Sequence, residues 1–589
     1  MSIVLGINCS FHETSAALVK DGNLICAVAE ERFNRKKRGK EIKINNPNEL
    51  PFKAIENCLS RLNISYTEVD YWAISFDPEL RLKNNLDWES EDKKNFSRFI
   101  KEYNKTYPEG SFGTIKGERL FYDKLLTIPS LLKNKGAKIN NKNFFFLPHH
   151  LCHAASSFHA SGFDNAAILI LDAGGEYESS WMAEGKDKKI KKIKSIDFPN
   201  SLGFLWIKLS EFCGLGYYGS GKLMGLASWG NSKNYMKEME SLIKITEEGF
   251  ETNEERILAA TDNFSGIEDL FKLKRNRTRL TLEHEDFQKY ADIASALQER
   301  TIKVVLHLIA KLKKMTNSDK LCLAGGLFLN CHVNQKILES ELFNEIYICP
   351  AATDDGTAAG AAFEISSRIG ELKNKKIKNW FFGNYYTNDK IEEELKKENL
   401  AYRKFDNIEM ETAKLLHNDK VIAWFQDGFE FGPRALGCRS ILANPLFPNK
   451  ERLNSKKIKD RENFRPVCPS VIEHSAKVYF SIKQIEQPHF NMLSTTKIKK
   501  DWINKLIGIK HPDDTARIQL VSKENKRFYN LLDEFRKLSG VGVIINTSFN
   551  SRGEPIVNSP KDAIKTFKKC KGIDYLVIGD FIVKRWQNE

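Results

Sequence analysis

The sequence predicts an α/β protein whose N-terminal part contains the same structural unit twice. The first observation is a succession of strand, polar loop, strand, hairpin and strand at 3–30, which recurs at 167–196. The second is the alternation of apolar strand-like runs with amphipathic helices between 291 and 369, which is typical of a layered α/β lobe. The third is the length of 589 residues, which exceeds what one hydrophobic core supports and indicates roughly two to four domains.

Each copy of the repeated unit consists of three strand-like runs. In the first copy they are separated by a polar loop at 9–15 and by the hairpin signal Asp21-Gly22. In the second copy the first strand ends at Asp172. Such a duplication is typical of an actin-like phosphate-binding fold, although two unrelated hairpins would give the same pattern. The expected strands are 3–8, 16–20 and 24–30 in the first copy, and 167–171, 179–183 and 190–196 in the second.

The stretch from 291 to 369 completes an α/β lobe. Its first helix, 291–314, has Ile293, Leu297 and Leu308 on one face. The turn that follows the next strand contains the pair Gly325-Gly326. The further expected elements are strand 320–324, helix 329–338, strand 346–350, loop 351–356 and helix 357–369.

A domain boundary is expected in the lysine-rich stretch 366–379. It separates an actin-like domain, 1–370, from a C-terminal α/β domain, 380–589. The segment 231–285 is charged and weakly periodic, and we interpret it as an insertion. The elements expected in the C-terminal domain are helix 409–418 and strands 421–425, 516–521 and 542–547.

Two histidines and two aspartates are candidate metal ligands. His149 and His153 open a helix-forming run, and a spacing of four residues places both imidazoles on one face of a helix. Asp172 ends a strand, and Asp354 lies in the loop at 353–356. A His₂Asp₂ set with open positions suits Fe²⁺, which we favour, or Mn²⁺ or Zn²⁺, better than Mg²⁺ or Ca²⁺. The alternative is that the aspartates are turn residues and the histidines cap the helix.

Two glycine-containing turns are candidates for binding a nucleotide. Gly325, Gly326 and Asn330 lie between a strand and a helix, where backbone N–H groups and the helix N-terminus favour an anion. Lys222 lies in the loop 219–225, which resembles a phosphate-binding loop but lacks Walker spacing. The alternatives are a turn that needs glycine only for its path and a solvated loop lysine.

His12 lies in the polar loop after the first strand. A histidine in such a turn is a candidate to orient or deprotonate the hydroxyl group of a substrate. An ordinary loop histidine is the alternative.

The C-terminal domain has arginines in sharply defined contexts. Arg434 lies in a Gly-Pro-Arg turn, Arg465 precedes a proline, and Arg517 opens a strand. Asn546 and Ser548 end another strand in a cluster of amides and hydroxyls. Arginine presents a bidentate fork to phosphate or carbamate oxygens, so the set suits a phosphoanhydride site. Each arginine taken alone is more often part of a salt bridge.

Taken together, these motifs resemble the family of O-carbamoyltransferases from nodulation-factor, aminoglycoside and other antibiotic pathways. The resemblance covers nearly the whole chain, and its motifs occur in the same order. They are the His12 loop, 30–33, 35–37, 149–153, 221–227, Gly325-Gly326, 430–436, Arg465-Pro466 and 546–550.

The resemblance implies a duplicated ribonuclease H-like, that is actin-like, N-terminal domain and a YrdC-like α/β C-terminal domain. It also implies a division of labour. The C-terminal domain would convert carbamoyl phosphate and ATP into carbamoyl-adenylate. The N-terminal domain, with its metal, would transfer the carbamoyl group to a hydroxyl and release AMP. ATP and carbamoyl phosphate would then be co-substrates, with Mg²⁺ as a further candidate ion beside ATP.

The resemblance further assigns roles to single residues. His12 would lie near the acceptor and, with Lys37, belong to the catalytic site. The implied metal ligands are His149, His153, Asp172 and Asp354; the implied adenylate-binding residues are Lys37, Lys222, Gly325, Gly326 and Asn330; and the implied carbamoyl phosphate and ATP ligands are Arg434, Arg465, Arg517, Asn546 and Ser548.

The chain departs from the family pattern at two places. After 35–37 the family usually has a histidine and an acidic residue, whereas Arg38-Gly39-Lys40 follows here. The glycine that usually precedes the aspartate of the metal loop is replaced by Thr353. The basic loop beyond Arg38 is expected to face the acceptor, so these departures affect mainly the identity of the acceptor.

Composition and charge bear on the acceptor and on the compartment. A net charge of +14 fits either a lysine-rich composition or an anionic partner such as DNA. We expect a sugar or secondary metabolite as acceptor, with a hydroxymethylated DNA base such as 5-hydroxymethylcytosine as the alternative. Eleven cysteines without a CxxC pair indicate the reducing cytoplasm, and no apolar run approaches the roughly 18 residues of a membrane span.

A non-enzymatic function is the remaining alternative. An actin-like ATP-binding subunit without transferase turnover would explain the N-terminal motifs. The presence of both sets of motifs in one chain favours an enzyme. The sequence leaves the oligomeric state open.

Overall fold

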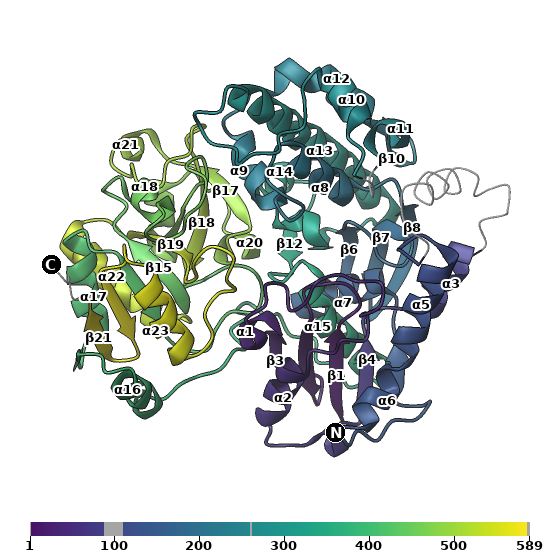
Figure 1. The fold of residues 1–589 in the computed structure, drawn as a ribbon, viewed down its shortest axis with the longest axis horizontal. Coiled ribbons are helices and arrows are strands. Elements are labelled where there is room, and N and C mark those ends of the chain that lie inside the picture. The colour runs from purple at the N-terminus through teal and green to yellow at the C-terminus, as the bar shows by residue number, and fades with distance from the viewer. Residues whose placement is uncertain (1, 87–109, 259–261, 586–589) are drawn as a thin grey trace. The chain divides into compact units, whose positions relative to one another are not determined.

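The computed structural model describes residues 2–86, 110–258 and 262–585 (Figure 1). The chain forms two compact units. The first unit comprises residues 1–280 and 285–378, and the second comprises residues 281–284 and 379–589.

The first unit is built on two five-stranded sheets with the same strand order. The first strand of each repeated motif, β1 or β6, lies in the centre of its sheet. It is antiparallel to its hairpin partner on one side and parallel to a later strand on the other. This confirms the predicted duplication of an actin-like topology. The first sheet has the order β3-β2-β1-β4-β5, with β1 Ile3–Asn8, β2 Ser15–Lys20, β3 Asn23–Ala29, β4 Tyr71–Ile74 and β5 Phe144–Phe146. The second has the order β8-β7-β6-β11-β12, with β6 Asn165–Leu171, β7 Glu178–Lys186, β8 Lys189–Asp197, β11 Lys320–Ala324 and β12 Glu345–Ile348.

Two helices pack against each other between these sheets. Helix α7, His149–Ser161, lies on β6 and β11, and helix α15, Thr357–Arg368, lies on β1 and β2 (Figure 1). Small residues allow this close approach. A Cβ atom at Gly360 would lie 1.8 Å from the carbonyl oxygen of Cys152, and one at Gly6 would lie 2.0 Å from that of Ala358. Backbone-to-backbone contact therefore fixes the spacing of both helices relative to the first sheet.

The other helices of the first unit cover the outer faces of the sheets. The long helix α13, Phe287–Thr316, contains the predicted helix 291–314 and buries Ile293, Leu297 and Leu308. The predicted helix 329–338 begins later than expected, because Asn330 caps α14, Cys331–Glu339, by accepting two backbone N–H groups. The segment 231–285 contains α10 Met236–Leu242, the hairpin β9 Ile243–Thr246 and β10 Gly249–Thr252, α11 Glu254–Ile257 and α12 Ser265–Phe271.

The remaining helices of this unit are short or moderate in length. They are α1 Glu31–Asn34, α2 Phe52–Ser60, α3 Pro78–Leu86, α5 Ile115–Leu126, α6 Ile128–Lys133, α8 Leu202–Phe212 and α9 Ser220–Ala227. Helix α2 packs on β2 and β3, whereas α3 packs on α5, and α9 packs on α13.

The second unit is one mixed nine-stranded sheet covered by helices on both faces. The central strand β14 shows how the sequence produces this arrangement. Ile422 and Trp424 point to one face, and Ala423 and Phe425 point to the other, as the two-residue period of a strand requires. The sheet order is β13-β21-β20-β14-β15-β19-β16-β18-β17.

The three strands predicted in the second unit are present as β14, β18 and β19. The strands of the sheet are β13 Tyr402–Lys404, β14 Ile422–Phe425, β15 Arg439–Ala443, β16 Cys468–Ile472, β17 Ser494–Lys497, β18 Thr515–Val521, β19 Val543–Ser548, β20 Tyr575–Ile578 and β21 Phe581–Lys584.

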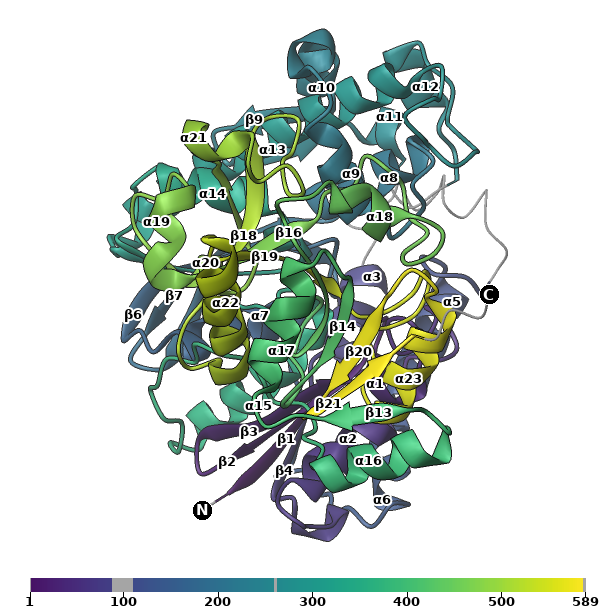
Figure 2. The ribbon, with the colours of Figure 1, turned by 90° about the vertical axis from the view of Figure 1, so that its left-hand side faces the viewer.

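A pair of helices packs on each face of this sheet. Helix α17, Ile408–His417, which was predicted at 409–418, packs side by side with α22, Lys526–Ser539 (Figure 2). Helices α16, Asn388–Lys397, and α23, Pro560–Lys569, pack together on the other face. The shorter helices are α18 Asn449–Asn454, α19 Ala476–Tyr479, α20 Gln487–Phe490 and α21 Lys500–Ile503.

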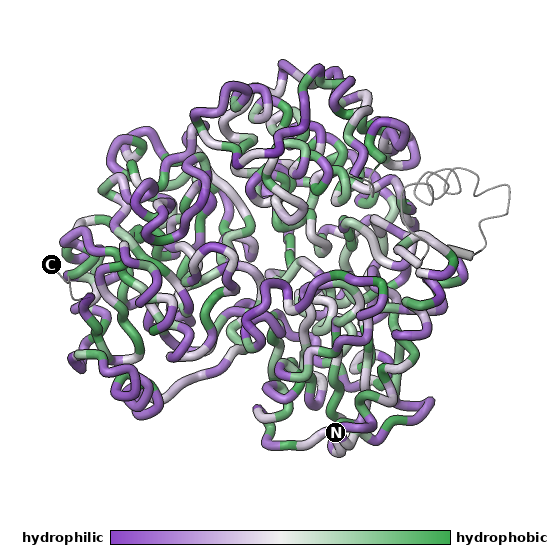
Figure 3. Tube along the Cα trace, viewed as in Figure 1, coloured by the Kyte–Doolittle hydropathy of each residue, from purple (hydrophilic) through white to green (hydrophobic). Residues whose placement is uncertain are grey.

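Hydropathy follows this layering within each unit. The central strands are largely hydrophobic, whereas the outer helices alternate hydrophobic and hydrophilic segments (Figure 3). All eleven cysteines are buried and free. Within the described ranges, every helix is too short or too polar to cross a bilayer.

Candidate metal centre and anion site

Four side chains of the first unit converge on one point, and they are the four predicted metal ligands. His149 and His153 lie on the first turns of α7, Asp172 follows β6, and Asp354 opens a short turn before α15. One ligand atom from each lies within 4.8 Å of the others. All four residues are buried.

The imidazoles and carboxylates face one another directly. The two Nε2 atoms of His149 and His153 are 3.1 Å apart. Nε2 of His149 is 3.5 Å from Oδ1 of Asp354 and 3.7 Å from Oδ2 of Asp172. Nε2 of His153 is 3.7 Å from the same Oδ1 of Asp354. Each group therefore presents one atom to a common centre.

Neighbouring groups orient these ligands. Nδ1 of His149 lies 3.3 Å from the carbonyl oxygen of Ser75, which directs a proton to Nδ1 and leaves the Nε2 lone pair facing the cluster. The backbone N–H of Gly326 donates to Oδ1 of Asp172 at 3.0 Å, which leaves Oδ2 facing His149. At the start of α7, the buried Glu176 carboxylate accepts the backbone N–H of His149 at 2.9 Å.

The donor set fits a divalent transition metal. A cation about 2.1 Å from two nitrogens holds adjacent ligand atoms roughly 3.0–3.4 Å apart, which matches the spacing of the two Nε2 atoms. Two imidazoles and two carboxylates provide a nitrogen and oxygen set of borderline softness. The sequence expectation of Fe²⁺, Mn²⁺ or Zn²⁺ is compatible with this set.

Burial and the two aspartates determine the protonation of the cluster. Burial opposes the protonation of His149, but Asp354 and Asp172 outweigh it and raise the pKa of this imidazole well above its usual value. Burial also raises the pKa of Asp172, but His149 and His153 overcome this and lower it to about 2. The pKa of Asp354 falls well below its usual value for the same reason. Both aspartates are thus ionised at neutral pH.

We expect metal binding to compete with protons. A cation binds the neutral imidazole. Because the pKa of His149 is raised, this imidazole is still protonated at pH values at which histidine is usually neutral, so binding must displace that proton. Affinity for Mn²⁺ should therefore increase as the pH rises from about 6 to about 8, with release of about one proton. Titration calorimetry in buffers of different ionisation enthalpy measures both quantities. An affinity independent of pH would contradict this account.

His12 lies beside the cluster on the loop between β1 and β2. Its Nδ1 is 3.4 Å from Oδ2 of Asp354. The side chain of Asn8 fixes the loop by donating to the carbonyl oxygens of His12 and Glu13, both at 3.0 Å. The structure thus brings His12 together with the four candidate ligands.

The predicted nucleotide-binding residues are placed differently. Lys37 is exposed in the turn after α1. Lys222, in the first turn of α9, donates to the carbonyl oxygen of Leu215 at 3.2 Å. The backbone N–H of Gly326 is used by Asp172, and Asn330 both caps α14 and donates to Gln298. Gly325 has φ +97°, which favours glycine at this turn.

A separate cluster of arginines lies in the second unit. Nε and Nη2 of Arg517, on β18, lie 3.0 and 2.7 Å from Sγ of Cys468, on β16. Burial, and then the neighbouring Arg465 and Arg517, lower the pKa of Arg461 to about 9. Burial also lowers the pKa of Arg465, whose carboxylate partner Glu462 lies 3.7 Å away. Three guanidinium groups thus repel one another, which is typical of a site that binds an anion.

Polar groups at the end of β19 extend this region. Asn546 donates to Ser470 and Gln519, both at 3.0 Å, and is buried. The hydroxyl of Ser548 donates to Asn550 at 2.7 Å. The buried Lys459 donates to the backbone and side chain of both Ser548 and Asn550.

The loop that carries Arg434 is held by one carboxylate. Glu430 accepts the backbone N–H groups of Leu436 and Cys438 at 2.7 and 2.8 Å. Arg434 is half-buried in this loop.

Sequence reasoning missed two residues of this region, Lys459 and Arg461. Arg461 lies four residues before Arg465, and its Nη2 is buried without a hydrogen-bond partner among the described residues. The spacing of four was the signal available in the sequence. It carried little weight because the chain there, at 455–467, is largely irregular.

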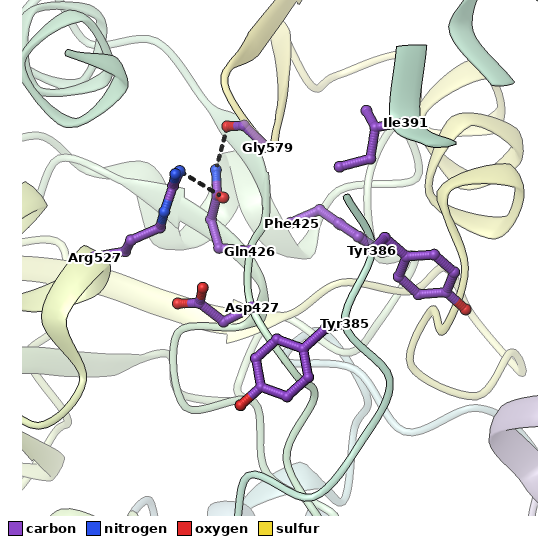
Figure 4. A pocket seen from close by; sticks show the side chains of 8 residues that line it. All are labelled: Tyr385, Tyr386, Ile391, Phe425, Gln426, Asp427, Arg527 and Gly579. Atoms are coloured by element: carbon purple, nitrogen blue, oxygen red, sulfur yellow. Dashed lines mark hydrogen bonds between the residues drawn. The ribbon is translucent and has the colours of Figure 1, made fainter. Parts of the chain in front are cut away.

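The second unit also has a pocket at the end of β14. It is lined by aromatic and polar side chains, among them Tyr385, Tyr386 and Asp427 (Figure 4). Arg527 is held at its wall by Asp580 and Gln426, at 2.8 and 3.1 Å. None of the predicted site residues lines this pocket.

Comparisons with known proteins match both parts of the chain that contain the predicted motifs. Residues 3–363 match the family described as "Carbamoyltransferase N-terminus", and residues 413–585 match "Carbamoyltransferase C-terminus". An uncharacterized protein of Synechocystis sp. is 33% identical over 100% of this chain and 99% of its own length. Nodulation protein NolNO of Sinorhizobium fredii is 31% identical over 98% of this chain and 80% of its own.

A more distant relative has a named reaction. The 3'-hydroxymethylcephem-O-carbamoyltransferase of Amycolatopsis lactamdurans is 25% identical over 74% of this chain and 80% of its own length. The matches span both units. This chain therefore belongs to the carbamoyltransferase family and is an enzyme of that class.

Proposed function

We propose that the enzyme forms carbamoyl-adenylate from carbamoyl phosphate and ATP and then transfers the carbamoyl group to a hydroxyl of a sugar or secondary metabolite. The observation that carries this proposal is the presence of two different sites in one chain. One is the buried His₂Asp₂ cluster beside His12, and the other is the arginine cluster of the second unit.

The proposed reaction balances in two stages. Carbamoyl phosphate, ATP and water give carbamoyl-adenylate, pyrophosphate and phosphate. The acceptor hydroxyl then attacks the carbamoyl carbon, the bond to the adenylate oxygen breaks, and AMP leaves with the acceptor's proton transferred to a base. Activation is needed because the carbamoyl carbon, conjugated to nitrogen, is a poor electrophile.

The second unit supports the first stage. Arg461, Arg465 and Arg517 offer planar donors to phosphate or carbamate oxygens, and their mutual repulsion is relieved when an anion binds. Arg434, Asn546 and Ser548 lie on the loops and strand ends that complete our proposed set. Here ATP would be bound together with carbamoyl phosphate, with Mg²⁺ as an accompanying ion.

The first unit supports the second stage. A bound divalent cation supplies Lewis-acid stabilisation of negative charge that develops on the transferred group. His149, His153, Asp172 and Asp354 would hold this cation. Nδ1 of His12 faces Asp354, so Nε2 is the atom left to take the proton of the acceptor hydroxyl. Lys37, Lys222 and the turn at Gly326 are our candidates for holding the adenylate.

The positive charge of the chain does not by itself favour a DNA acceptor. Several lysines are concentrated on β8, which is an edge strand of its sheet. Lysines on an edge strand prevent pairing with other chains, which accounts for part of the charge without a nucleic acid. A hydroxymethylated DNA base is therefore retained as an alternative acceptor and as an arm of the test.

The test is product analysis with the isolated chain. The enzyme, ATP, carbamoyl phosphate and Mn²⁺ or Fe²⁺ are incubated with an amino sugar, a hydroxymethyl cephem or hydroxymethylcytosine-containing DNA. Mass spectrometry should detect pyrophosphate and AMP, and one acceptor with a hydroxyl hydrogen replaced by a carbamoyl group. Failure to consume carbamoyl phosphate in an ATP-dependent manner would refute the proposal and favour a binding subunit.

A further inference from the structure

Two exposed tyrosines lie next to the candidate metal centre, in the loop between α8 and α9. Tyr217 is 39% exposed and Tyr218 is 46% exposed. Their rings are in edge contact, with centroids 4.9 Å apart. The proposed chemistry described above gives neither ring a role. Exposed aromatic rings beside a catalytic centre are typical of surfaces that bind ring-shaped ligands.

Tyr218 adjoins the group that we propose as the base. Its ring centroid is 5.8 Å from that of His12, and the two rings meet at 61°. His12 in turn lies 3.4 Å from the candidate ligand Asp354. A ring placed against Tyr218 is therefore within one side chain of the reacting centre.

Arg38 holds Tyr218 from one side. The Arg38 guanidinium lies 3.6 Å from the centroid of the Tyr218 ring, which is a close cation–π contact. Arg38 is itself fixed, because its Nη1 donates to Glu13 at 2.7 Å and its backbone N–H donates to Glu31 at 2.6 Å. The aromatic surface is thus rigid before any ligand arrives, which lowers the entropic cost of binding.

The local backbone supports the same arrangement. Gly39 has φ +81°, and a Cβ atom there would lie 2.0 Å from the hydroxyl oxygen of Thr14. The path of the chain that places Arg38 over Tyr218 therefore depends on glycine at position 39.

Unused polar atoms lie in the loop that carries His12. The side chain of Ser10 is 97% buried, and its Oγ has no hydrogen-bond partner among the described residues. Oε2 of Glu13 also has no hydrogen-bond partner within that part of the chain, although the Glu13 side chain is 18% exposed. Buried polar atoms are rarely left unpaired, so the loop that carries His12 has hydrogen-bonding capacity that its own contacts do not use.

We propose that Tyr218, which carries the Arg38 guanidinium against its ring, is the stacking surface for the ring of the acceptor. We propose that it thereby determines which acceptors are used. The inference rests on the proposed function and adds the class of acceptor, a ring-bearing alcohol. The ring lies against Tyr218, and the reacting hydroxyl points to His12. The shared chemistry is a ring face, which either a pyranose or a planar heterocycle provides.

Binding can be tested without turnover. Saturation-transfer NMR is recorded for the full chain with methyl β-glucopyranoside, with 5-hydroxymethyl-2'-deoxycytidine and with glycerol, which has no ring. One ring compound should bind the unsubstituted enzyme, and its signal should be lost in Tyr218→Ala and retained in Tyr218→Phe. Phe447→Ala, which removes a similarly exposed ring from the second unit, is the matched control and should bind normally.

Kinetics separate this proposal from the proposed function. With the ring compound that binds, Tyr218→Ala should raise the acceptor KM by about 10-fold or more, with kcat changed by less than about threefold. Carbamoyl-adenylate formation without acceptor should be unchanged in this variant. If the unsubstituted enzyme forms no carbamoyl-adenylate, the proposed function fails, whereas the NMR result still decides the stacking surface.

Three results would overturn the stacking proposal. The first is the absence of binding by both ring compounds to the unsubstituted enzyme. The second is equal binding of the ring compound to Tyr218→Ala and to the unsubstituted enzyme. The third is a loss of adenylate formation together with acceptor binding, which would indicate a structural role for Tyr218.

Discussion

Replacing His149 by alanine is expected to abolish carbamoyl transfer while carbamoyl-adenylate formation continues. His149 lies closest to the other three candidate ligands, with contacts of 3.1, 3.5 and 3.7 Å. Its removal leaves two ionised aspartates and a single imidazole, so one of the four donors to a divalent cation is lost. We expect metal affinity and the rate of transfer to fall by more than about 100-fold.

The measurement has two readouts and a matched control. Bound metal is determined by elemental analysis, and adenylate and carbamoylated product are determined by mass spectrometry. His150→Gln is the control, because His150 is the adjacent buried imidazole and burial lowers its pKa to about 3, so that it is uncharged. The control should retain the metal. If His149→Ala also stopped adenylate formation, the division of labour between the two sites would be wrong.

Replacing Arg465 by glutamine is expected to abolish carbamoyl-adenylate formation without destabilising the protein. Arg465 is half-buried beside Arg461 and Arg517, and its pKa is lowered by burial and by the neighbouring Arg517. Removing one positive charge weakens phosphate binding, for which a loss of about 100-fold or more is expected. The same change relieves repulsion between guanidinium groups but removes the pair with the buried Glu462 at 3.7 Å, so the melting temperature should change little.

The combination of outcomes distinguishes a functional from a structural arginine. Arg552→Gln is the control, since Arg552 is 55% exposed and pairs with Asp460 on the surface. It should alter neither activity nor stability. An Arg465→Gln variant that melts well below the unsubstituted enzyme would show that Arg465 stabilises the fold, and the anion site would then need other residues. Metal binding by the first unit should be normal in both variants.

Much of the fold could be predicted because its signals are local. Strand β1 and its hairpin partner β2 appear as apolar runs on either side of a polar loop, and the second copy repeats that order. The pair His149 and His153 could be predicted as neighbours because a helix fixes the spacing of residues four apart. The start of α14 was misplaced because the capping role of Asn330 depends on its side-chain conformation.

The contacts that could not be predicted from the sequence are those between loops far apart in the chain. Arg38 and Tyr218 are 180 positions apart, and each lies in a segment without periodicity. The convergence of Arg461 and Arg465 on Arg517 depends on how an irregular segment folds against β18. No helical or strand period relates such residues, so only the tertiary structure brings them together.

The placement of the four candidate ligands makes a bound cation a cross-link in the chain. Asp354 lies 205 positions after His149, so a cation bound to both would join distant parts of the chain in the folded state and would be released when the unit unfolds. Loading with metal should then stabilise the first unit by an amount that grows with the logarithm of the free metal concentration, and leave the second unit unaffected. Metal supply would thereby regulate the lifetime of the enzyme in addition to its activity.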